Sequence, residues 1–218
     1  MVYSPRIVVI IPAYNEENSI AKVIHDIPQG LVNEVIVVNN NSNDDTDINA
    51  RKAGATVLHE ARPGYGSACL KGIAYLQQLQ QAPDIVVFID ADYSDHPEEM
   101  PLLVQRIMEG CDMVIGSRAL GRREKGSMTV QQVFGNWLAT RLLKFFYHVQ
   151  YTDLGPFRAI SYEKLLELEM RDTTYGWTVE MQLKAAKARM KITEVPVTYR
   201  KRIGFSKISG TLKGTVMA

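Results

Sequence analysis

Two acidic residues directly behind an apolar run are the strongest candidates for chemistry in this chain. The sequence FIDAD places Asp90 and Asp92 at the end of a strand-like stretch. Side chains two positions apart in an extended segment point the same way, so both carboxylates can converge on one cation or on one sugar and metal cluster. Mg²⁺ or Mn²⁺ prefers such oxygen ligands and keeps positions open for phosphate oxygens. Residues 72–105 contain six acids and no Lys or Arg, so no nearby base in the sequence neutralises the pair. The alternative is a solvated turn in which Ser94 or Asp95 caps the next helix.

Three other polar segments follow apolar runs in the same way. In IPAYNEE, Pro12 stops strand pairing, and the acids after it also suit the first turn of a helix. Asn39 and Asn40 come next, and a carboxamide can read a nucleobase because it both donates and accepts hydrogen bonds. Asn is equally typical of tight turns. Gly64 and Gly66 precede a helical stretch and could let a phosphate approach its N-terminus.

Basic residues gather in the second half of the chain. Residues 1–110 carry 15 acids and 7 bases, a net charge of −8, whereas residues 111–218 carry 9 acids and 18 bases, a net charge of +9. This asymmetry suggests a first half that holds a cation and a second half that holds anions. The segments 118–125 and 184–213 hold most of these bases, with glycine and serine beside them, which favours an anion-binding loop over a merely solvated face. An acceptor that is a phosphate monoester is already anionic at neutral pH, so it needs cations to position it more than a general base.

The elements that must position these residues alternate between strand and helix. The expected strands of the first half are Ile7–Ile11, Glu34–Val38, Ala55–His59, Asp84–Ile89 and Asp112–Ile115, and the expected helices are Ser19–Ile27, Asp45–Ala53, Ser67–Leu79 and Pro97–Glu109. The later elements are a helix at Val133–Val149, a strand at Phe157–Ser161, a helix at Gly176–Ala188 and a strand at Ile192–Arg200. Alternation of helices with nearly continuous apolar strands predicts an α/β fold whose parallel sheet is covered on both faces and binds ligands at the carboxyl ends of its strands. We expect a single domain over residues 1–218.

Composition excludes several classes of protein. A hydrophobic content of 46% with 22% charged residues argues against disorder. Two cysteines without a CxxC pair exclude a disulfide scaffold and a zinc knuckle, and suit a reducing compartment. The apolar runs are far shorter than the ~18 residues of a membrane span, and no signal-peptide pattern opens the chain. We therefore expect a cytoplasmic protein, at most peripheral on the cytoplasmic face of a membrane, with no nucleic-acid partner and an undetermined oligomeric state.

Several segments together resemble, in the family's order, the family 2 glycosyltransferases with the GT-A fold: IPAYNEE, VVNNNSNDDT, RPGYGSACLKG, FIDADYSDHPEEM and DMVIGSR. The segments DLGPFRAIS, YGWTVEMQLKA and VPVTYRKRIGFSK are similar to those of the branch that transfers sugars to dolichyl or polyprenyl phosphate. The resemblance runs from about Ile7 to Gly210. It implies a GT-A fold with a mostly parallel central sheet and helices on both faces, a Mg²⁺ or Mn²⁺ cofactor, a UDP- or GDP-sugar donor, a lipid-phosphate acceptor as in cell-envelope glycan synthesis, and inversion at the anomeric carbon. The nucleotide and metal would bind to about residues 1–110, and the acceptor to about residues 111–218.

The resemblance also implies roles for individual residues on the donor side. The residues that would lie against the nucleotide are Pro12, Tyr14 and Glu16, with Gly64 and Gly66 near the phosphates. Asn39 and Asn40 stand where the family commonly has aspartates that read the base, and this departure leaves the nucleotide open. Asp90 would approach the ribose or the sugar, and Asp92 would hold the metal that bridges the diphosphate.

On the acceptor side two chemistries remain open. The residues that would meet the acceptor phosphate or the donor diphosphate are Arg118, Arg202, Ser206 and Lys207. Arg158 could bind phosphate or pair with Asp153. If the acceptor is instead a hydroxyl of a glycolipid, polysaccharide or protein, a carboxylate must take its proton. Glu180 stands near the position of that base in relatives, and Asp153 is a second candidate. A rival of another class is a catalytically silent membrane adaptor that binds a nucleotide sugar, which the intact acidic pair and the basic loop argue against.

The aromatic residues of the expected helix Val133–Val149 have two interpretations. The favoured one is that its apolar face belongs to the domain core. The alternative is that this face lies on a bilayer, with Arg141, Lys144 and His148 near the headgroups. We also expect Trp177 to pack in the core rather than to stack on a sugar.

Overall fold

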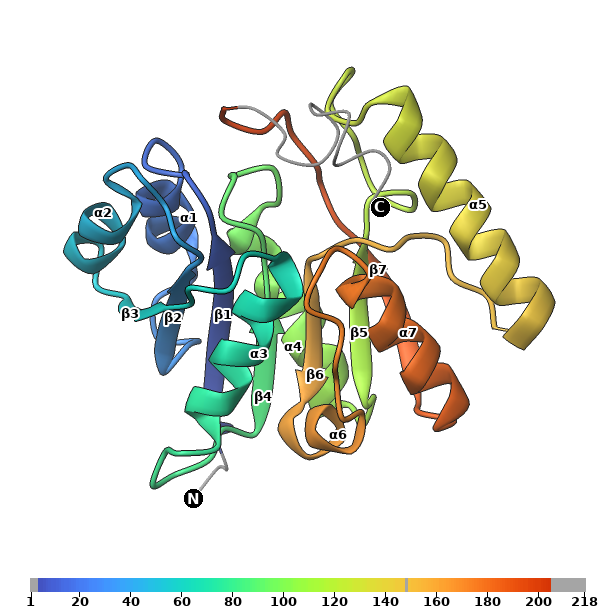
Figure 1. Cartoon of the computed structure of the whole chain (residues 1–218). Coiled ribbons are helices and arrows are strands. Elements are labelled where there is room, and N and C mark those ends of the chain that lie inside the picture. The colour runs from blue at the N-terminus through green and yellow to red at the C-terminus, as the bar shows by residue number, and fades with distance from the viewer. Residues whose placement is uncertain (1–3, 148, 205–218) are drawn as a thin grey trace.

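A seven-stranded sheet, in the order β3-β2-β1-β4-β6-β5-β7, runs through the centre of the computed structural model (Figure 1). The structure describes residues 4–147 and 149–204. The strands are β1 (Ile7–Ala13), β2 (Glu34–Asn39), β3 (Thr56–His59), β4 (Ile85–Phe88), β5 (Met113–Ser117), β6 (Arg158–Ser161) and β7 (Ile192–Pro196). β6 pairs antiparallel with β4 and with β5, whereas every other pair is parallel. The mostly parallel sheet that the sequence predicts is confirmed.

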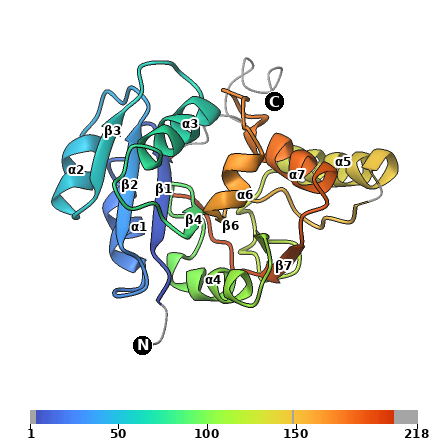
Figure 2. The ribbon, with the colours of Figure 1, turned by 90° about the horizontal axis from the view of Figure 1, so that it is seen from below.

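Helices cover both faces of this sheet, as expected (Figure 2). They are α1 (Ile20–Asp26), α2 (Thr46–Lys52), α3 (Tyr65–Leu76), α4 (Met100–Met108), α5 (Val130–Tyr147), α6 (Tyr162–Glu167) and α7 (Trp177–Lys187), and the 3₁₀ helix η1 (Pro97–Glu99) precedes α4. Buried side chains of α1, α2 and α4 form the core on one face. Those of α3, α6 and α7 form the core on the other face.

Strand β1 shows why the central strands read as unbroken apolar runs. Ile7, Val9 and Ile11 point into the core that α1 and α4 cover, whereas Val8 and Ile10 point into the core that α3 covers. All five are at most 2% exposed. Because successive side chains of a strand alternate between faces, a strand covered on both sides needs apolar residues at every position.

The carboxyl ends of β1, β2 and β4 meet at one edge of the sheet. Ala13 pairs with Asn39, and Ile10 pairs with Phe88, so the segments after these strands leave side by side. Asp95 forms an isolated bridge with Tyr199, which brings the end of the described chain to the same edge. This edge is where the ligand site of a parallel α/β sheet is expected.

The expected interpretation of the aromatic helix as core is wrong. Leu143 is the only buried residue of α5, and most of its large apolar side chains are exposed. The helix packs on α7 at the outer end of the molecule (Figure 2). Helical periodicity predicts an apolar face but not what covers it.

Two smaller differences have local causes. The short helix α6 escapes the periodicity argument because six residues make fewer than two turns. Strand β7 ends at Pro196 rather than continuing to Arg200, since the chain leaves the sheet and Tyr199 bridges Asp95 and Arg123 instead.

Candidate active site

A cavity of about 300 Å³ opens at the carboxyl ends of β1, β2 and β4, beside the start of α3. Its lining comes from five loops, from the end of β1 and the start of α3, and from the last described residues of the chain: Pro12, Ala13, Tyr14, Glu16, Asn40, Asn41, Pro63, Gly64, Tyr65, Ala68, Asp90, Ala91, Asp92, Tyr175 and Arg202. Eight of the residues singled out in the sequence are in this set, namely Pro12, Tyr14, Glu16, Asn40, Gly64, Asp90, Asp92 and Arg202.

The two aspartates follow β4 directly. Asp92 is 4% exposed, and its Oδ1 atom accepts hydrogen bonds from the Ser94 backbone N–H (2.9 Å) and the Ser94 hydroxyl (2.5 Å). Its Oδ2 atom lies 3.1 Å from Arg202 Nη2. The Oδ1 atom of Asp90 is buried and has no hydrogen-bond partner among the described residues. Burial, together with the negative charge of Asp92, raises the pKa of Asp90 to about 7. The site therefore holds carboxylate oxygens with unused capacity for a cation.

Arg202 closes this site from the far end of the sequence. Its Nη2 atom lies 3.1 Å from Asp92 Oδ2 and 3.4 Å from Glu16 Oε1. The backbone N–H of Ile203 donates to the Asp92 carbonyl oxygen (2.9 Å), which fixes the segment over the pair. The guanidinium thus neutralises the carboxylates that the sequence leaves without a nearby base. Ser206 and Lys207, expected beside it, lie outside the described residues.

The carboxylates at this site can coordinate a divalent cation only together with oxygen atoms from a bound ligand. Among the described residues no group of three or more His, Cys, Asp or Glu side chains could hold a metal. Asp90 and Asp92 supply two carboxylates, of which Asp90 Oδ1 is unpartnered. Mg²⁺ characteristically binds through one or two carboxylates plus substrate phosphates and water, so this incomplete set suits a cation that arrives with a diphosphate.

The expectation that Asn39 and Asn40 read a base needs correction, because both side chains hold loops. Asn40 donates through Nδ2 to the carbonyl oxygens of Glu60 (3.0 Å) and Arg62 (2.7 Å). Its Oδ1 accepts from the Gly64 N–H (2.8 Å). Asn39 does not line the cavity, and its Oδ1 accepts from the backbone N–H of the turn that follows (2.9 Å). Base recognition therefore has to come from other groups.

The glycines at the start of α3, Gly64 and Gly66, also act differently from the expectation of phosphate approach. A Cβ atom at Gly64 would stand 2.0 Å from the Thr173 carbonyl oxygen, and one at Gly66 would stand 2.1 Å from that of Asp172. The N–H groups of Gly66 and Ser67 donate to carbonyl oxygens of the same segment (3.0 Å each). The first turn of α3 is thus occupied by the chain itself, and Gly66 does not line the cavity.

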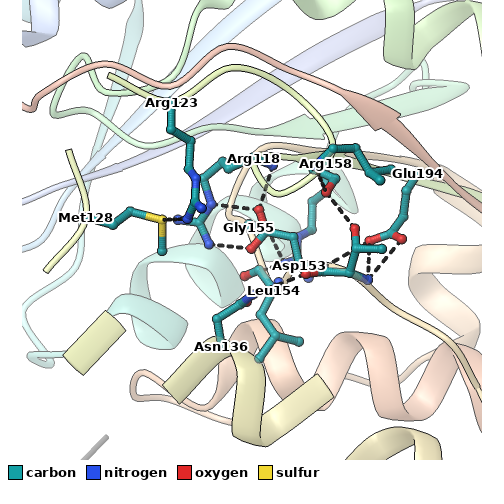
Figure 3. A network of polar contacts seen from close by, with 12 residues as sticks. Arg118, Arg123, Met128, Asn136, Asp153, Leu154, Gly155, Arg158 and Glu194 are labelled. Carbon is teal, nitrogen blue, oxygen red and sulfur yellow. Dashed lines mark hydrogen bonds and ion pairs between the residues drawn. The ribbon is translucent and has the colours of Figure 1, made fainter. Parts of the chain in front are cut away.

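Arg118 is paired inside the protein rather than presented to a ligand (Figure 3). Its Nε and Nη2 atoms donate to the two carboxylate oxygens of Asp153 at 2.8 and 2.6 Å, and its backbone N–H donates to Oδ2 at 2.7 Å. The side chains are 11% and 2% exposed. Burial alone would lower the pKa of Arg118, but the hydrogen bonds and charge of Asp153 raise it above its usual range. The same pairing removes Asp153 as a candidate base.

The expectation that Arg158 binds phosphate or pairs with Asp153 is corrected by full burial of this residue. Its guanidinium donates to the carbonyl oxygens of Thr178 (3.1 Å) and Gly155, so it fixes the loop that carries Asp153 (Figure 3). Burial lowers the pKa of Arg158. The sequence gives no sign of this role, because the partners are backbone carbonyls.

Glu180 is also placed away from the cavity. Its carboxylate accepts from the backbone N–H groups of Arg171 and Asp172 and pairs with Lys184 at 2.8 Å. Burial would raise the pKa of Glu180, but these partners hold it below its usual value. A carboxylate so engaged is a poor base, and the expectation that Glu180 takes a proton from the acceptor is corrected. Trp177, in contrast, is 1% exposed and packs against Phe88, as expected.

Sequence reasoning missed two aromatic residues of the cavity, Tyr65 and Tyr175. Both stand beside glycines in segments already singled out, and that position is the only sign the sequence offers. Sequence reasoning also considered Asp95 only as a possible helix cap, whereas this residue is 2% exposed with both carboxylate oxygens unpartnered among the described residues. Burial, with the charge of Asp90, raises the pKa of Asp95 well above its usual range.

The model of glycosyl transferase family 2 matches residues 8–168. The chain belongs to this family. An uncharacterized glycosyltransferase of Mycobacterium tuberculosis is 37% identical, over 97% of this chain and 94% of the relative. The undecaprenyl-phosphate mannosyltransferase of Micrococcus luteus is 28% identical, over 96% and 90%.

Solved structures of glucosyl-3-phosphoglycerate synthase from Mycobacterium tuberculosis are similar to this family 2 chain. The complex with phosphoglyceric acid superposes with a TM-score of 0.73 at 28% identity, covering 93% of this chain and 73% of that chain. The same synthase was crystallised with Mn²⁺, UDP and phosphoglyceric acid, and with Mg²⁺ and UDP. The expected GT-A fold and glycosyltransferase class are confirmed, and the silent adaptor loses its support.

Proposed function

We propose that this glycosyltransferase moves a sugar from a UDP- or GDP-sugar to a polyprenyl phosphate, with Mg²⁺ or Mn²⁺ at Asp92. The observation that carries the proposal is the cavity at the carboxyl ends of the strands, where Asp90 and Asp92 meet the cation Arg202. A carboxylate pair beside an arginine is suited to a diphosphate and its metal, since each charge of the ligand finds an opposite charge.

The donor nucleotide would contact the cavity-lining residues at the end of β1 and the start of α3. Tyr14 is 43% exposed at the cavity, and its ring offers a face on which a nucleobase can stack. Pro12 and Ala13 supply the wall beneath it, and Tyr65 lies on the α3 side. The neighbouring synthase binds UDP in crystals, which supports a uridine nucleotide over a guanosine one.

Asp92 would hold the metal, and Asp90 would hold the sugar or ribose. Asp92 Oδ2 lies 3.1 Å from the Arg202 guanidinium, and Asp90 Oδ1 is buried without a hydrogen-bond partner among the described residues. When bound, the metal supplies positive charge against the diphosphate that leaves the anomeric carbon. Arg202 adds a second positive charge from the protein side.

A phosphate acceptor does not require a general base to take a proton from it. In the reaction the bond between the anomeric carbon and the diphosphate oxygen breaks, and a bond to an acceptor phosphate oxygen forms, with inversion if attack comes from the opposite face. An anionic phosphate oxygen attacks without losing a proton. The two candidate bases, Asp153 and Glu180, are both engaged elsewhere. The exposed cationic side chains of Arg122, Arg123 and Lys125 are available to attract an anionic acceptor.

A second candidate acceptor is a soluble phosphorylated metabolite such as phosphoglycerate, because the neighbouring synthase was crystallised with phosphoglyceric acid. The relative that acts on undecaprenyl phosphate favours the lipid. A hydroxyl acceptor with Glu180 as base has no support from the geometry, because this carboxylate is engaged and lies away from the cavity, and Glu180→Gln tests the point. A phosphate acceptor tolerates this substitution, whereas a hydroxyl acceptor does not.

The deciding experiment is a donor and acceptor matrix read by mass spectrometry. UDP- and GDP-sugars are combined with polyprenyl phosphate or 3-phosphoglycerate, each with Mg²⁺, Mn²⁺ or EDTA. We expect a sugar polyprenyl phosphate from one donor, and none with EDTA or with Asp92→Asn. Product from 3-phosphoglycerate alone would overturn the lipid acceptor and keep the transferase.

A further inference from the structure

Helix α5 presents a face of large apolar side chains to solvent. This α5 aromatic face consists of Phe134, Trp137, Leu138, Leu142, Phe145 and Phe146, which are 41 to 73% exposed. Figure 2 shows α5 beside α7 at the outer end of the molecule, and no other described helix or strand lies beyond it. Soluble monomers rarely leave such a contiguous patch uncovered, and patches of this kind mark protein or membrane contacts.

The charges on and beside the helix favour a partner with a negatively charged surface. Residues 126–152 contain no Asp or Glu, while Arg141 and Lys144 stand exposed on α5. The Arg141 guanidinium lies 5.6 Å from the centre of the Trp137 ring, so a cation borders the aromatic surface. Aromatic and aliphatic side chains interleaved with bases suit the interface of a bilayer that contains anionic lipid.

A second copy of the chain fits this face poorly. An α5–α5 contact would bring Arg141 and Lys144 toward their own copies, and the helix has no acid to compensate them. Unpaired like charges brought together at an interface oppose association. No described helix is long and apolar enough to cross a bilayer, so α5 would lie along the surface and not span it.

We propose that the α5 aromatic face docks this enzyme on an anionic lipid surface. The proposal rests on the proposed function, because it explains how a water-exposed cavity meets an acceptor that stays in a membrane. Figure 1 shows α5 beginning near the edge of the molecule where the strands' carboxyl ends open.

Helix α5 is fixed to the acceptor half by specific bonds. Asn136 donates through Nδ2 to the Thr152 carbonyl oxygen (3.2 Å) and accepts through Oδ1 from the Leu154 N–H (2.8 Å). The residue between them, Asp153, holds Arg118, whose guanidinium lies 5.0 Å from the centre of the Tyr199 ring, three residues before Arg202. A lipid surface that binds α5 would therefore also determine how the cavity is oriented toward that surface.

Tryptophan fluorescence tests the docking without any substrate. The chain has two tryptophans, of which Trp137 is 50% exposed on α5 and Trp177 is 1% exposed in the core. We expect vesicles of phosphatidylcholine with phosphatidylglycerol to shift the emission to the blue, and brominated acyl chains to quench it. Trp137→Phe should remove both responses, since Trp177 is sequestered. An unchanged emission of the wild-type protein would overturn the proposal.

Vesicle cosedimentation with matched variants measures the contribution of the face. Phe134→Ser with Phe145→Ser should weaken binding by roughly tenfold or more, because two large apolar side chains no longer enter the interface. The control is Leu102→Ser with Met108→Ser on α4, whose side chains are comparably exposed at 45% and 61% on the opposite side of the sheet. Equal binding by both double variants would contradict the proposal.

Two further experiments test the contribution of charge to vesicle binding and the alternative that the α5 aromatic face forms a dimer. Arg141→Gln with Lys144→Gln should reduce the preference for anionic over neutral vesicles, and a preference left intact would contradict the charge argument. A concentration-dependent dimer that Phe134→Ser with Phe145→Ser abolishes, without vesicle binding by the wild type, would assign the face to a second copy and overturn the proposal.

Transfer to a short, water-soluble polyprenyl phosphate tests the proposed function alone. We expect the Phe134 and Phe145 double variant to keep this activity and to lose transfer to vesicle-bound acceptor. If both proteins fail with the soluble acceptor while the wild type still binds vesicles, the proposed function fails and the docking stands.

Discussion

Replacing Asp153 by Asn should destabilise the protein strongly, although the two side chains have the same shape. The substitution leaves Arg118 buried at 11% exposure without a counter-charge, and it replaces one of the two accepting oxygens (2.8 and 2.6 Å from the guanidinium) by an NH₂ group that cannot accept. Removing one partner of a buried ion pair costs about 3–5 kcal/mol. Asp95 interacts electrostatically with the same guanidinium and can take over part of the neutralisation, so we expect the lower end, about 3 kcal/mol.

The assay is thermal and urea unfolding of the ligand-free protein. In a chain of this length about 3 kcal/mol corresponds to a fall of roughly 6–12 °C in Tm. The matched control is Glu109→Gln, which breaks the exposed pair with Arg106 and should leave Tm nearly unchanged. A loss below about 1 kcal/mol for Asp153→Asn would refute the buried-pair argument.

A double variant then separates the structural role of Arg118 from a role toward ligand. Arg118→Met with Asp153→Leu removes both charges together, and replacing a whole buried pair by apolar groups is often neutral for stability. We expect it to be more stable than Asp153→Asn. If the folded double variant still transfers sugar to polyprenyl phosphate, Arg118 only supports the loop. If transfer is lost while donor binding persists, Arg118 also contacts the acceptor.

Three further substitutions test the site. Because the pKa of Asp90 is raised to about 7, the folded state holds a proton that the unfolded state releases from about pH 4 upward. The free energy of unfolding should therefore fall as pH rises through this window, and Asp90→Asn should flatten the fall in urea titrations without metal. An unchanged slope would contradict the shift. Gly66→Ala should cost about 1–3 kcal/mol because its Cβ would meet a carbonyl oxygen at 2.1 Å, whereas Gly135→Ala, in open space on α5, should be neutral or stabilising. Similar melting temperatures for these two variants would refute the packing argument. Arg202→Gln should strengthen Mn²⁺ binding in the absence of nucleotide, measured by electron paramagnetic resonance, and weaken UDP binding, measured by calorimetry; weaker Mn²⁺ binding would contradict competition for the aspartate.

What the sequence predicts well is whatever depends on chain direction and strand ends. Asp90 and Asp92 reach the cavity because β4 ends at Phe88, and the end of a strand is a local property. Parallel neighbours place Pro12 and Tyr14 at the same edge for the same reason. The sequence also shows that no nearby base neutralises the acidic pair, but it does not reveal that Arg202, near the end of the described residues, pairs with Asp92.

What the sequence could not predict depends on partners that come from other segments. Asn40 resembles a base-reading residue until Glu60 and Arg62 are seen to accept its hydrogen bonds. Arg158 resembles a phosphate ligand until its full burial among backbone carbonyls is known. A carboxamide or guanidinium carries the same chemistry whether it serves a loop or a ligand, so only the three-dimensional surroundings decide. The same holds for α5, whose periodicity fits a core helix and a surface helix equally.

The opposite charges of the two halves, −8 and +9, meet physically at the Arg202–Asp92 pair. The Arg202 guanidinium, 3.1 Å from Asp92 Oδ2, stands against the carboxylate that would hold the metal. A metal ion alone would have to displace this cation, or lie beside it at a cost in like-charge repulsion. A metal bound to a nucleoside diphosphate brings negative oxygens that can pair with the released guanidinium. Metal and donor should therefore bind together more tightly than either binds alone, since the second half of the chain supplies a charge that only the diphosphate can satisfy.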